Sequence, residues 1–343
     1  MRVSAVRKAL LYSRLGGGRV RCLLCERRCL IRNGERGYCG TRVNLDGELY
    51  TLVYGDLSAV ESRPMEVKPF YHFWPGSKAL TFSTWSCNFS CPWCQNFDIS
   101  SVKPPVKDGM HIPPEELVNM ALRREDRGLC ASFNEPTMQF EYTLDVFRLS
   151  REKGLHNTYV SNGYMSRKAL EMLAGSGLDG IKIDIKGDER VYREVLGVNY
   201  EVPWRNVELA KMLGLHVEVV FLVVTGISDD ENVLRDVIDR HLKHAGPDTP
   251  LHINRYFPAY KYLKDPTPLE TLYRAHRIAR KEGVNFVYVG NVPGNPYEHT
   301  YCPECNYLLI KRQGFSVVEY RLTKDKKCPK CGRKIPVVGE YFN

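Results

Sequence analysis

The middle of the chain alternates apolar runs of strand length with longer segments of helical period. The apolar runs, which are the strand candidates, are Ala79–Thr84, Leu129–Phe133, Asn157–Ser161, Gly180–Ile185, Val217–Val224, Leu251–Asn254 and Asn285–Val289. The helical segments lie between them and comprise Pro114–Arg123, Gln139–Lys153, Ser166–Ala174, Val202–Leu213, Glu231–His244 and Pro268–Glu282. Alternation of this kind predicts βα units with a parallel sheet.

Two local signals support the helix boundaries. Pro114 fits the first turn of its helix, where a missing N–H costs nothing, and Ser166 is a residue type that caps helices. Six or seven βα units favour an α/β fold with a partial or closed (β/α) barrel of six to seven parallel strands. In such barrels the chemistry lies at the carboxyl ends of the strands.

Two smaller modules flank the predicted barrel. We predict an N-terminal cysteine-rich module with its connector over residues 1–75, the barrel over 76–298 and a terminal module over 299–343. The first contains the β-prone run Glu48–Tyr54 and an irregular connector, Pro64–Gly76, rich in aromatic residues and proline. The terminal module has no helical period and many Lys and Arg residues.

Composition narrows the class of protein. The 343 residues are 43% hydrophobic and 26% charged, which suits a globular protein with a sizeable core. The formal charge of +9 is moderate and no RNA-binding motif accompanies it, so we expect neither nucleic acid nor membrane as a partner. The N-terminus lacks an apolar secretory signal, and the most apolar run, Val217–Val224, carries Glu218 and is too short to span a bilayer. We therefore expect a cytoplasmic protein.

The cysteines point to metal. Twelve are many for a cytoplasmic chain, and a reducing compartment argues against disulfide bonds. Eleven of the twelve fall into three clusters, and only Cys130 stands alone. Clustered cysteines in this setting indicate metal sites.

The second cluster, formed by Cys87, Cys91 and Cys94, occupies one loop directly after the first barrel strand. Iron–sulfur cubes are normally held by four Cys thiolates, so three local cysteines leave one iron open to a substrate molecule. A zinc site would require a fourth protein ligand, and this loop offers no obvious one. The spacing therefore predicts a [4Fe–4S] cluster held by these three thiolates.

Three cysteines at this spacing, with the aromatic Trp93 just before the last, resemble the motif of the radical S-adenosylmethionine (SAM) superfamily. The resemblance implies that the amino and carboxylate groups of SAM chelate the open iron. One electron from the reduced cluster then breaks a sulfonium C–S bond, and the 5′-deoxyadenosyl radical so formed abstracts hydrogen from a substrate. The protein orients this cofactor and keeps water out.

The same resemblance implies further SAM contacts at the ends of the next two strands. Asn134 and Glu135 correspond to the family's glycine-rich Glu-Pro motif, in which the carboxylate grips the methionine amino group through a charge-assisted hydrogen bond. Asn134 replaces the glycine of that motif. Ser161, Asn162 and Gly163 end the third strand, which the resemblance places near the ribose and carboxylate of SAM. Asn-Gly also favours an ordinary turn.

Three charged residues, Lys182, Asp184 and Lys186, alternate along the fourth strand and therefore share one face. Charges fit beside an inward-facing cofactor, whereas charges pressed against packed helices do not, so Asp184 and Lys186 are candidates to line the SAM cavity. His252 in the sixth strand is a further candidate, although a histidine in a strand is also common as a packed core residue. Asn291, after the last strand, resembles a family element near the adenine.

The third cluster pairs Cys302 and Cys305 with Cys328 and Cys331. Two Cys-x-x-Cys knuckles at this separation can supply four thiolates tetrahedrally, as in zinc ribbons and rubredoxin-like iron sites. We predict zinc because a structural site needs no redox activity, and the pattern is also compatible with iron.

The first cluster comprises Cys22, Cys25, Cys29 and Cys39. These four cysteines can bind zinc structurally or hold a second iron–sulfur cluster for electron delivery. No closely spaced ferredoxin run of four cysteines is present. We therefore predict a structural metal, zinc, at this N-terminal site.

Nearly the whole chain resembles one group of radical enzymes, the AmmeMemoRadiSam system radical enzyme, a relative of pyruvate formate-lyase activating enzymes. One departure is Phe133-Asn134, where Tyr and a small polar residue are expected. The resemblance implies Memo-like and AMMECR-type companions and a reductant such as ferredoxin or flavodoxin. The stretches that carry it are Cys22–Arg42, His72–Gly76, Cys87–Cys94, Phe133–Tyr142, Ser161–Tyr164, Tyr288–Asn291 and the terminal module.

Three functions are compatible with these motifs to different degrees. The first is a radical enzyme that acts on a protein, as the activases of glycyl radical enzymes do. The second uses the same chemistry on a small molecule or an RNA. The third is a non-catalytic metal-binding scaffold, which the three-cysteine motif opposes.

Overall fold

The computed structural model describes residues 5–104 and 111–342, and its contacts divide the chain into two compact units. The first unit comprises Met1–Arg63 and Ala79–Ile181, and the second comprises Pro64–Lys78 and Lys182–Asn343. This division by contact differs from the modules 1–75, 76–298 and 299–343, which follow the order of motifs along the chain. The three modules stay a prediction.

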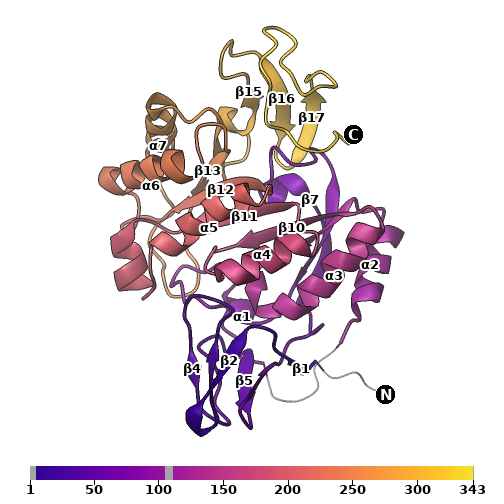
Figure 1. The fold of residues 1–343 in the computed structure, drawn as a ribbon. Helices are drawn as coiled ribbons and strands as arrows, with labels where there is room; N and C mark the ends of the chain where they lie inside the picture. Colours follow the sequence, from indigo (N-terminus) through magenta and orange to yellow (C-terminus); the bar gives the residue numbers. More distant parts are fainter. Residues whose placement is uncertain (1–4, 105–110, 343) are drawn as a thin grey trace. The chain divides into compact units, whose positions relative to one another are not determined.

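The first unit combines small antiparallel sheets with the first βα repeats (Figure 1). Its short strands form two three-stranded sheets, and they are β1 (Arg7–Lys8), β2 (Tyr12–Leu15), β3 (Arg19–Cys22), β4 (Leu30–Ile31), β5 (Arg42–Leu45) and β6 (Glu48–Thr51). The elements that follow are β7 (Ala59–Pro64), β8 (Lys78–Ser83), α1 (Phe97–Ser100), α2 (Pro114–Arg123), β9 (Gly128–Ala131), α3 (Phe140–Glu152), β10 (His156–Ser161) and α4 (Arg167–Gly175). Single 3-10 turns cover Gly16–Gly18 and Pro136–Gln139.

The second unit continues the βα repeats and ends in a small sheet. Its repeats consist of β11 (Gly180–Ile185), which starts at the end of the first unit, α5 (Glu201–Met212), β12 (His216–Val223), α6 (Glu231–His244), β13 (Leu251–Arg255), α7 (Leu269–Glu282) and β14 (Val287–Gly290). Short helical turns cover Met65–Val67, Val191–Val195 and Pro296–Glu298. The small sheet contains β15 (Thr300–Tyr301), β16 (Leu308–Gln313) and β17 (Ser316–Tyr320).

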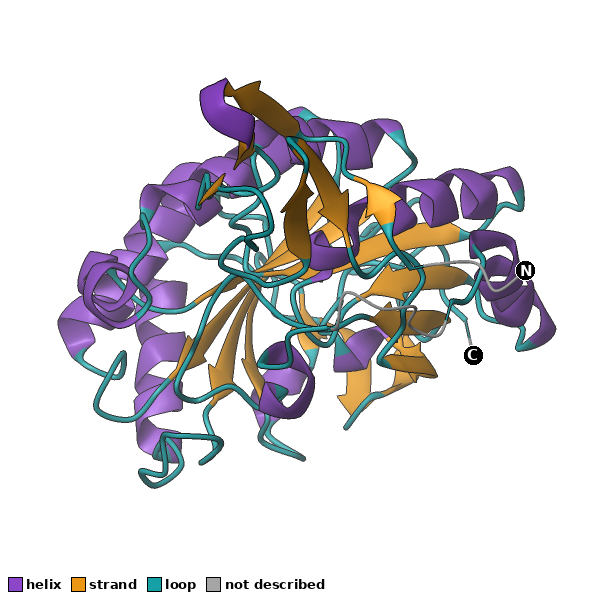
Figure 2. Ribbon diagram, turned by 90° about the horizontal axis from the view of Figure 1, so that it is seen from below, coloured by secondary structure: helices purple, strands orange, loops and turns teal. Residues whose placement is uncertain are grey.

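The largest sheet has eight strands, in the order β14-β13-β12-β11-β10-β9-β8-β7. The pairs β8–β9, β9–β10, β12–β13 and β13–β14 are parallel. The predicted α/β fold with a mostly parallel sheet is thereby confirmed. The sheet has eight strands rather than six or seven, and its order has two ends, so the partial form of the predicted barrel fits the described residues. Figure 2 shows these strands in orange and the helices in purple.

Local signals explain several element boundaries. Ser166 caps α4 as predicted, because its hydroxyl accepts a hydrogen bond from the N–H of Ala169 at 3.3 Å. Pro114 occupies the first turn of α2, also as predicted. Asp230 caps α6 by accepting from the N–H of Asn232 at 2.9 Å.

The terminal sheet, yellow in Figure 1, packs on the core of the second unit. Its strands β15, β16 and β17 pair antiparallel. Leu309 and Ile310 of β16 are fully buried and belong to one apolar cluster with Phe286 and with Tyr288 of β14. The terminal residues therefore share a core with the end of the βα region.

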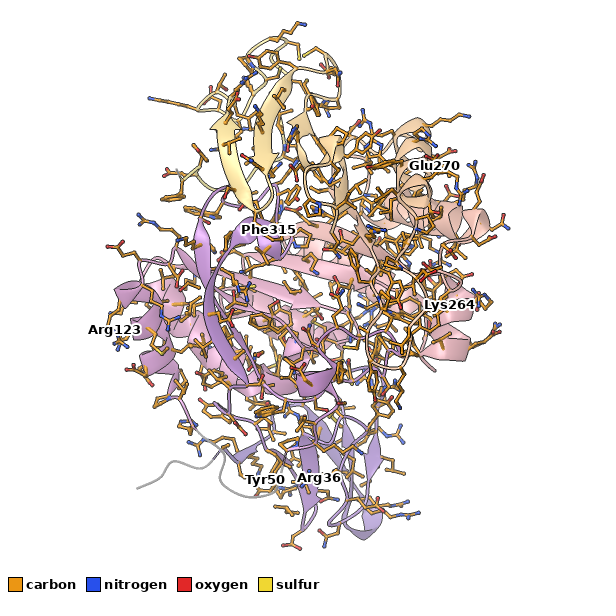
Figure 3. The ribbon with its side chains drawn as sticks, turned by 180° about the vertical axis from the view of Figure 1, so that it is seen from behind. Arg36, Tyr50, Arg123, Lys264, Glu270 and Phe315 are labelled. Carbon is orange, nitrogen blue, oxygen red and sulfur yellow. The ribbon has the colours of Figure 1, made fainter. Side chains whose placement is uncertain are left out.

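Charged side chains occupy the outer faces of the helices. Figure 3 labels Arg123 of α2 and Glu270 of α7, both exposed, and Phe315, which is 58% exposed in the turn between β16 and β17. Within the part of the chain that the structure describes, no helix is both long enough and apolar enough to cross a membrane.

Candidate functional site

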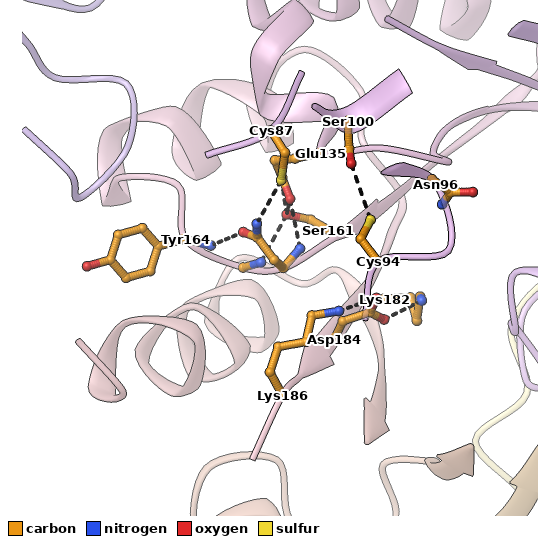
Figure 4. Close-up of polar contacts among 12 residues, drawn as sticks. Cys87, Cys94, Asn96, Ser100, Glu135, Ser161, Tyr164, Lys182, Asp184 and Lys186 are labelled. Carbon is orange, nitrogen blue, oxygen red and sulfur yellow. Dashed lines mark hydrogen bonds and ion pairs between the residues drawn. The ribbon is translucent and has the colours of Figure 1, made fainter. Parts of the chain in front are cut away.

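The loop that follows β8 carries three half-buried cysteines in the first unit, Cys87, Cys91 and Cys94. Figure 4 labels Cys87 and Cys94. The N–H of Phe89 donates to Cys87 Sγ at 3.3 Å, and the Ser100 hydroxyl hydrogen-bonds to Cys94 Sγ at 3.2 Å. Burial raises the pKa of the Cys87 thiol well above its ordinary value. A thiolate at this position therefore depends on hydrogen-bond donors and on a bound metal for its stability.

The turn after β9 is tied to the cysteine loop. Phe133 adopts a left-handed backbone conformation with φ of 69°, which a side chain of this size rarely adopts. The amide of Asn96 donates to the Phe133 carbonyl, and Asn134 Nδ2 donates to the Ser86 carbonyl at 2.6 Å. These two hydrogen bonds fix the start of the Glu135 segment against the loop that holds the cysteines.

Glu135 is 3% exposed and accepts hydrogen bonds from neutral donors. The Ser161 hydroxyl lies 2.9 and 3.1 Å from its two oxygens, the N–H of Asn162 donates at 2.8 Å, and the N–H of Thr137 donates at 3.1 Å. Burial raises the pKa of the Glu135 carboxyl, and these hydrogen bonds offset only part of that effect. A buried carboxylate with neutral donors is suited to receive an ammonium group.

Asn162 connects the Glu135 side of the site to the cysteine loop. Its Nδ2 donates to Asn88 Oδ1 at 2.7 Å and lies 3.9 Å from Cys87 Sγ, while its Oδ1 accepts the N–H of Tyr164 at 3.0 Å. Figure 4 shows the contacts that reach Cys87 and Tyr164 as dashed lines. The structure thus brings together four residues that the sequence analysis selected separately, namely Cys87, Glu135, Ser161 and Asn162.

Two further predicted residues lie in the same unit. Gly163 has φ of 70°, a conformation that glycine adopts without strain, and its N–H donates to Ser161 Oγ at 3.0 Å. Trp93 is 2% exposed, so its ring is packed in the interior.

In the second unit, Lys182, Asp184 and Lys186 form a linked ion-pair group along β11. Asp184 contacts Lys182 Nζ through one carboxylate oxygen and lies 3.2 Å from Lys186 Nζ through the other. Burial alone raises the pKa of Asp184, but the two lysines outweigh burial and the pKa is lowered. The predicted shared face of these three residues is consistent with their contacts, and the assignment of Asp184 and Lys186 to SAM stays a prediction.

His252 and Asn291 each bond to a protein group within the second unit. His252 is 1% exposed, and its Nε2 lies 2.6 Å from an oxygen of Glu218 on β12. Asn291 has φ of 59°, and its Nδ2 donates to the Arg255 carbonyl at 2.9 Å. His252 thus has the packed, hydrogen-bonded setting of a core histidine, which was the alternative to a SAM contact. Neither SAM assignment is tested, and both stay predictions.

The terminal cysteines are gathered as a single group. Cys302 Sγ lies 3.5 Å from Cys331 Sγ, and Cys305 Sγ lies 3.6 Å from Cys328 Sγ. All four sulfur atoms lie within 4.8 Å of one another. Tetrahedral coordination by thiolates at about 2.3 Å places sulfur atoms about 3.8 Å apart, so this group can hold one metal ion.

The N-terminal cysteines line a pocket in the first unit. Cys22, Cys25, Cys29 and Cys39 all contribute to its wall, together with residues that include Arg42. Burial is the largest influence on Cys22 and raises the pKa of its thiol to about 12. The Cys22 thiol therefore needs a metal or a nearby cation to be charged at neutral pH.

Comparison with known proteins decides the family. Residues 83–238, which include the cysteine loop and Glu135, match the model of the Radical SAM superfamily. The chain belongs to the radical SAM superfamily. An uncharacterized protein of Methanocaldococcus jannaschii is 39% identical to this radical SAM chain over 336 residues, which cover 97% of the chain and 100% of that protein.

Activating enzymes are more distant relatives of this radical SAM chain. The pyruvate formate-lyase 1-activating enzyme of Escherichia coli is 26% identical over 174 residues, which cover 46% of the chain and 65% of that enzyme. The solved structure of Streptococcus suis SuiB bound to S-adenosylmethionine is 14% identical with a TM-score of 0.49, covering 62% of this chain and 52% of SuiB. The predicted radical SAM enzyme, related to activating enzymes, is confirmed. The AmmeMemoRadiSam subgroup and its Memo-like and AMMECR-type companions are not confirmed by these comparisons and stay predictions.

The radical SAM family implies SAM and a [4Fe–4S] cluster, and the donor set of the first unit fits both. The three thiols on one loop suit a cluster with one open iron. The Glu135 carboxylate is buried among neutral donors, and the buried Asn134 Oδ1 has no hydrogen-bond partner within the described residues. Two buried acceptors on one turn suit the ammonium group of SAM.

The sequence analysis missed three polar residues that the structure makes prominent. Asn88 bonds to Asn162, and Thr137 bonds to Glu135. Their positions beside the motifs could have identified them, since Asn88 directly follows Cys87 and Thr137 lies two residues after Glu135. Glu218 gave no signal beyond a single charge within an apolar strand, because its partners are distant in sequence.

Proposed function

We propose that this radical SAM enzyme cleaves SAM reductively at a [4Fe–4S] cluster held by Cys87, Cys91 and Cys94. When bound, the cluster and SAM supply a 5′-deoxyadenosyl radical that abstracts hydrogen from a substrate. One observation carries the proposal. The buried Glu135 carboxylate is hydrogen-bonded to Asn162, whose amide also reaches Asn88 beside the first cysteine.

The chain's own residues have distinct tasks in this proposal. Glu135 accepts the ammonium group of SAM, and Ser161 and Asn162 hold its carboxylate in one orientation through hydrogen bonds of 2.8 to 3.1 Å. The N–H of Phe89 and the amide of Asn162 point toward Cys87 Sγ. Hydrogen bonds to a cluster sulfur stabilise its negative charge and tune the reduction potential.

Anaerobic reconstitution tests the proposal directly. The full chain is loaded with iron and sulfide, reduced with dithionite and mixed with SAM, and 5′-deoxyadenosine and methionine are quantified. We expect both products from the native chain and none from Cys91→Ala. Cys130→Ala is the matched control, because Cys130 is a buried strand cysteine outside every cluster. Cleavage by Cys91→Ala, or no cleavage by a native chain with an intact cluster, contradicts the proposal.

We further propose that the substrate is a protein. The E. coli relative is named as an activating enzyme of pyruvate formate-lyase, and that lyase is itself a protein. A reductant of the ferredoxin or flavodoxin class supplies the electron. The alternatives are a small molecule and an RNA.

Fractionated extract of the native cell distinguishes these substrate classes. Extract is separated by size, and the large fraction is treated with protease or with ribonuclease before it is added to the reduced enzyme. A protein substrate accelerates 5′-deoxyadenosine formation in a manner that protease abolishes and ribonuclease leaves intact. Stimulation by the small fraction, or loss of stimulation after ribonuclease, contradicts a protein substrate.

We propose that the terminal group Cys302, Cys305, Cys328 and Cys331 binds one structural zinc ion. Its sulfur spacing suits one tetrahedral ion, and binding that ion would stabilise the folded terminal sheet. Metal analysis of the full chain should find about one zinc, which Cys302→Ser removes while SAM cleavage persists. Iron in place of zinc, or loss of the Cys87 cluster in Cys302→Ser, contradicts this assignment.

A further inference from the structure

The N-terminal pocket differs from the terminal cysteine group in the spacing of its sulfur atoms. All four terminal sulfur atoms lie within 4.8 Å of one another. Among the described residues, which include every cysteine of the chain, no other three thiols are gathered this closely. Cys22, Cys25, Cys29 and Cys39 line one pocket, and no three of them form a group of thiols as close as the terminal one.

Thiols whose sulfur atoms lie farther apart than in a one-ion site fit a larger ligand. A mononuclear tetrahedral site needs sulfur atoms about 3.8 Å apart, whereas an iron–sulfur cluster places each cysteine on a different iron of a wider core. The three thiols of Cys87, Cys91 and Cys94, which we propose to hold a cluster, likewise form no such close group among the described residues. The N-terminal set therefore resembles the cluster-binding loop rather than the zinc-like group.

The pocket also contains positive charge suited to an anionic cluster. Arg42 lines it, is 1% exposed and pairs with Glu141 at 2.7 Å through one terminal nitrogen. Its Nε has no hydrogen-bond partner within the described part of the chain, although it is buried. A buried donor without a partner is unfavourable, and the sulfur atoms of a cluster would supply the acceptor that Arg42 Nε lacks.

Direct hydrogen bonds join this pocket to the loop of Cys87, all within the first unit. Arg27 Nε donates to the Asn88 carbonyl at 2.6 Å, and the Tyr38 and Ser90 hydroxyls are 2.8 Å apart. The Ser86 hydroxyl donates to the Cys39 carbonyl. Asn88 itself belongs to the pocket wall.

The segments that carry the two cysteine sets are therefore in direct contact. Arg27, between Cys25 and Cys29, bonds to the residue after Cys87, and Tyr38, next to Cys39, bonds to the residue before Cys91. This short, fully bonded path is the arrangement expected between two redox centres that exchange electrons.

We propose that Cys22, Cys25, Cys29 and Cys39 hold a second iron–sulfur cluster that delivers electrons to the site at Cys87, in place of the structural zinc that the sequence alone favours. It takes one electron from a reduced protein of the flavodoxin or ferredoxin class, which is thereby oxidised by one electron. It passes that electron to the Cys87 site and returns to its oxidised state. The electron enters the sulfonium C–S bond of SAM, which breaks to methionine and the 5′-deoxyadenosyl radical. No proton moves in these steps. The delivery role rests on the proposed function, whereas the presence of the cluster does not.

Metal content tests the cluster independently of activity. The triple variant Cys87→Ala, Cys91→Ala, Cys94→Ala leaves the N-terminal set intact and is reconstituted anaerobically as the full chain. We expect it to retain about two or four irons with matching sulfide, about half or less of the native content, and an electron paramagnetic resonance signal after reduction. Zinc without iron at this site, or no iron at all, overturns the proposal. Because the N-terminal cysteines are unaltered, misfolding of that module does not obscure this result.

A second variant tests delivery. In Cys39→Ser, the ratio of the flavodoxin-driven to the dithionite-driven rate of SAM cleavage should fall by about tenfold or more, since only a protein donor depends on a relay. An unchanged ratio overturns the delivery role. If the triple variant keeps its iron but the native chain never cleaves SAM, the proposed function fails while the second cluster stands.

Discussion

Glu135 in the first unit and Glu218 in the second are both buried carboxylates on or beside strands of the large sheet, and their surroundings are opposite. Among residues 5–104 and 111–342, the donors to Glu135 are hydroxyl and amide groups. Glu218 accepts from His216 Nε2 at 2.9 Å and His252 Nε2 at 2.6 Å. The backbone N–H groups of residues 71 and 72 donate to it at 3.1 and 2.8 Å.

The pKa values of the two carboxyl groups shift in opposite directions. Burial raises the pKa of Glu135, and its neutral donors do not reverse the shift. Burial acts on Glu218 as well, but hydrogen bonds and charge from His216 and His252 outweigh it and lower the pKa. Glu218 has two donors on each carboxylate oxygen, so its hydrogen-bonding capacity is filled. The hydrogen bonds of Glu135 come from neutral groups of the described chain, and none comes from a cation. The donors around a buried carboxylate therefore distinguish a structural group from one that awaits a ligand.

Removing Glu218 should have the largest effect on stability. Glu218→Ala leaves two histidines and two backbone donors buried without their acceptor, so the free energy of unfolding should fall by about 3–5 kcal/mol. Urea denaturation of the native and variant chains measures this loss. Glu270→Ala is the control, because Glu270 is an exposed residue of α7 and its removal should change little. A fall in the free energy of unfolding of less than about 1 kcal/mol would show that Glu218 does not have a structural role.

Altering Glu135 should act on SAM binding instead. Glu135→Gln keeps the shape of the side chain and removes its charge, so the affinity for SAM should fall by roughly 1.5–3 kcal/mol, or about ten- to hundredfold. Calorimetry with the reconstituted enzyme gives the dissociation constant, and urea denaturation checks that the fold is retained. Unchanged affinity removes Glu135 from the SAM site.

Acid should lower the stability of the fold around His72 and Glu218. Burial lowers the pKa of His72, whose Nε2 lies 2.6 Å from the Tyr288 hydroxyl, to about 3. The unfolded chain therefore binds a proton at this histidine between about pH 6.5 and pH 3 that the folded chain does not bind. The free energy of unfolding should fall as pH falls through this window, by about 1.4 kcal/mol per pH unit for one such group. The lowered pKa of Glu218 adds a further loss in more acidic solution.

Denaturation at a series of pH values in the native chain and in His72→Gln checks this expectation. The variant should show a shallower fall, with a slope that remains because burial also lowers the pKa of His241, to about 4. Equal slopes in the two proteins would exclude His72 as the titrating group.

The smallest effect should come from Ser161→Ala. Its hydroxyl is one of several donors to Glu135, so the free energy of unfolding should fall by about 1 kcal/mol and SAM affinity should fall less than in Glu135→Gln. The same calorimetry and denaturation experiments measure both quantities. A loss of affinity larger than that of Glu135→Gln would mean that Ser161 contacts SAM itself rather than orienting Glu135.

Much of the fold was predictable where local signals agree. The predicted ranges Pro114–Arg123, Gly180–Ile185 and Glu231–His244 coincide with α2, β11 and α6. The two helices have a boundary residue, Pro114 in α2 and the capping Asp230 of α6, and β11 has the alternation of a strand. In contrast, β7 was missed because its sequence, Ala59 to Pro64, carries two charges and ends in proline, which is atypical of a strand.

The candidate site was predictable in part for the same reason. Cys87, Glu135 and Asn162 each follow a strand, so the βα pattern placed them at one edge before the hydrogen bonds were known. The environment of Glu218 was not predictable, because its backbone donors lie 147 and 146 residues away in sequence. Only the folded structure reveals that Glu218, the charged residue within an apolar strand, has hydrogen-bond donors on both carboxylate oxygens.

The contacts of Asn162 and Gly163 also bear on how the enzyme ages. An Asn-Gly dipeptide is prone to deamidation, in which the glycine nitrogen attacks the side-chain carbonyl of asparagine and closes a five-membered imide. Here the Gly163 N–H donates to Ser161 Oγ at 3.0 Å, and Asn162 Oδ1 accepts from Tyr164 at 3.0 Å. Ring closure would have to break both bonds within a buried turn. The hydrogen bonds that orient the site thus also protect a thermolabile asparagine from chemical decay while the chain is folded.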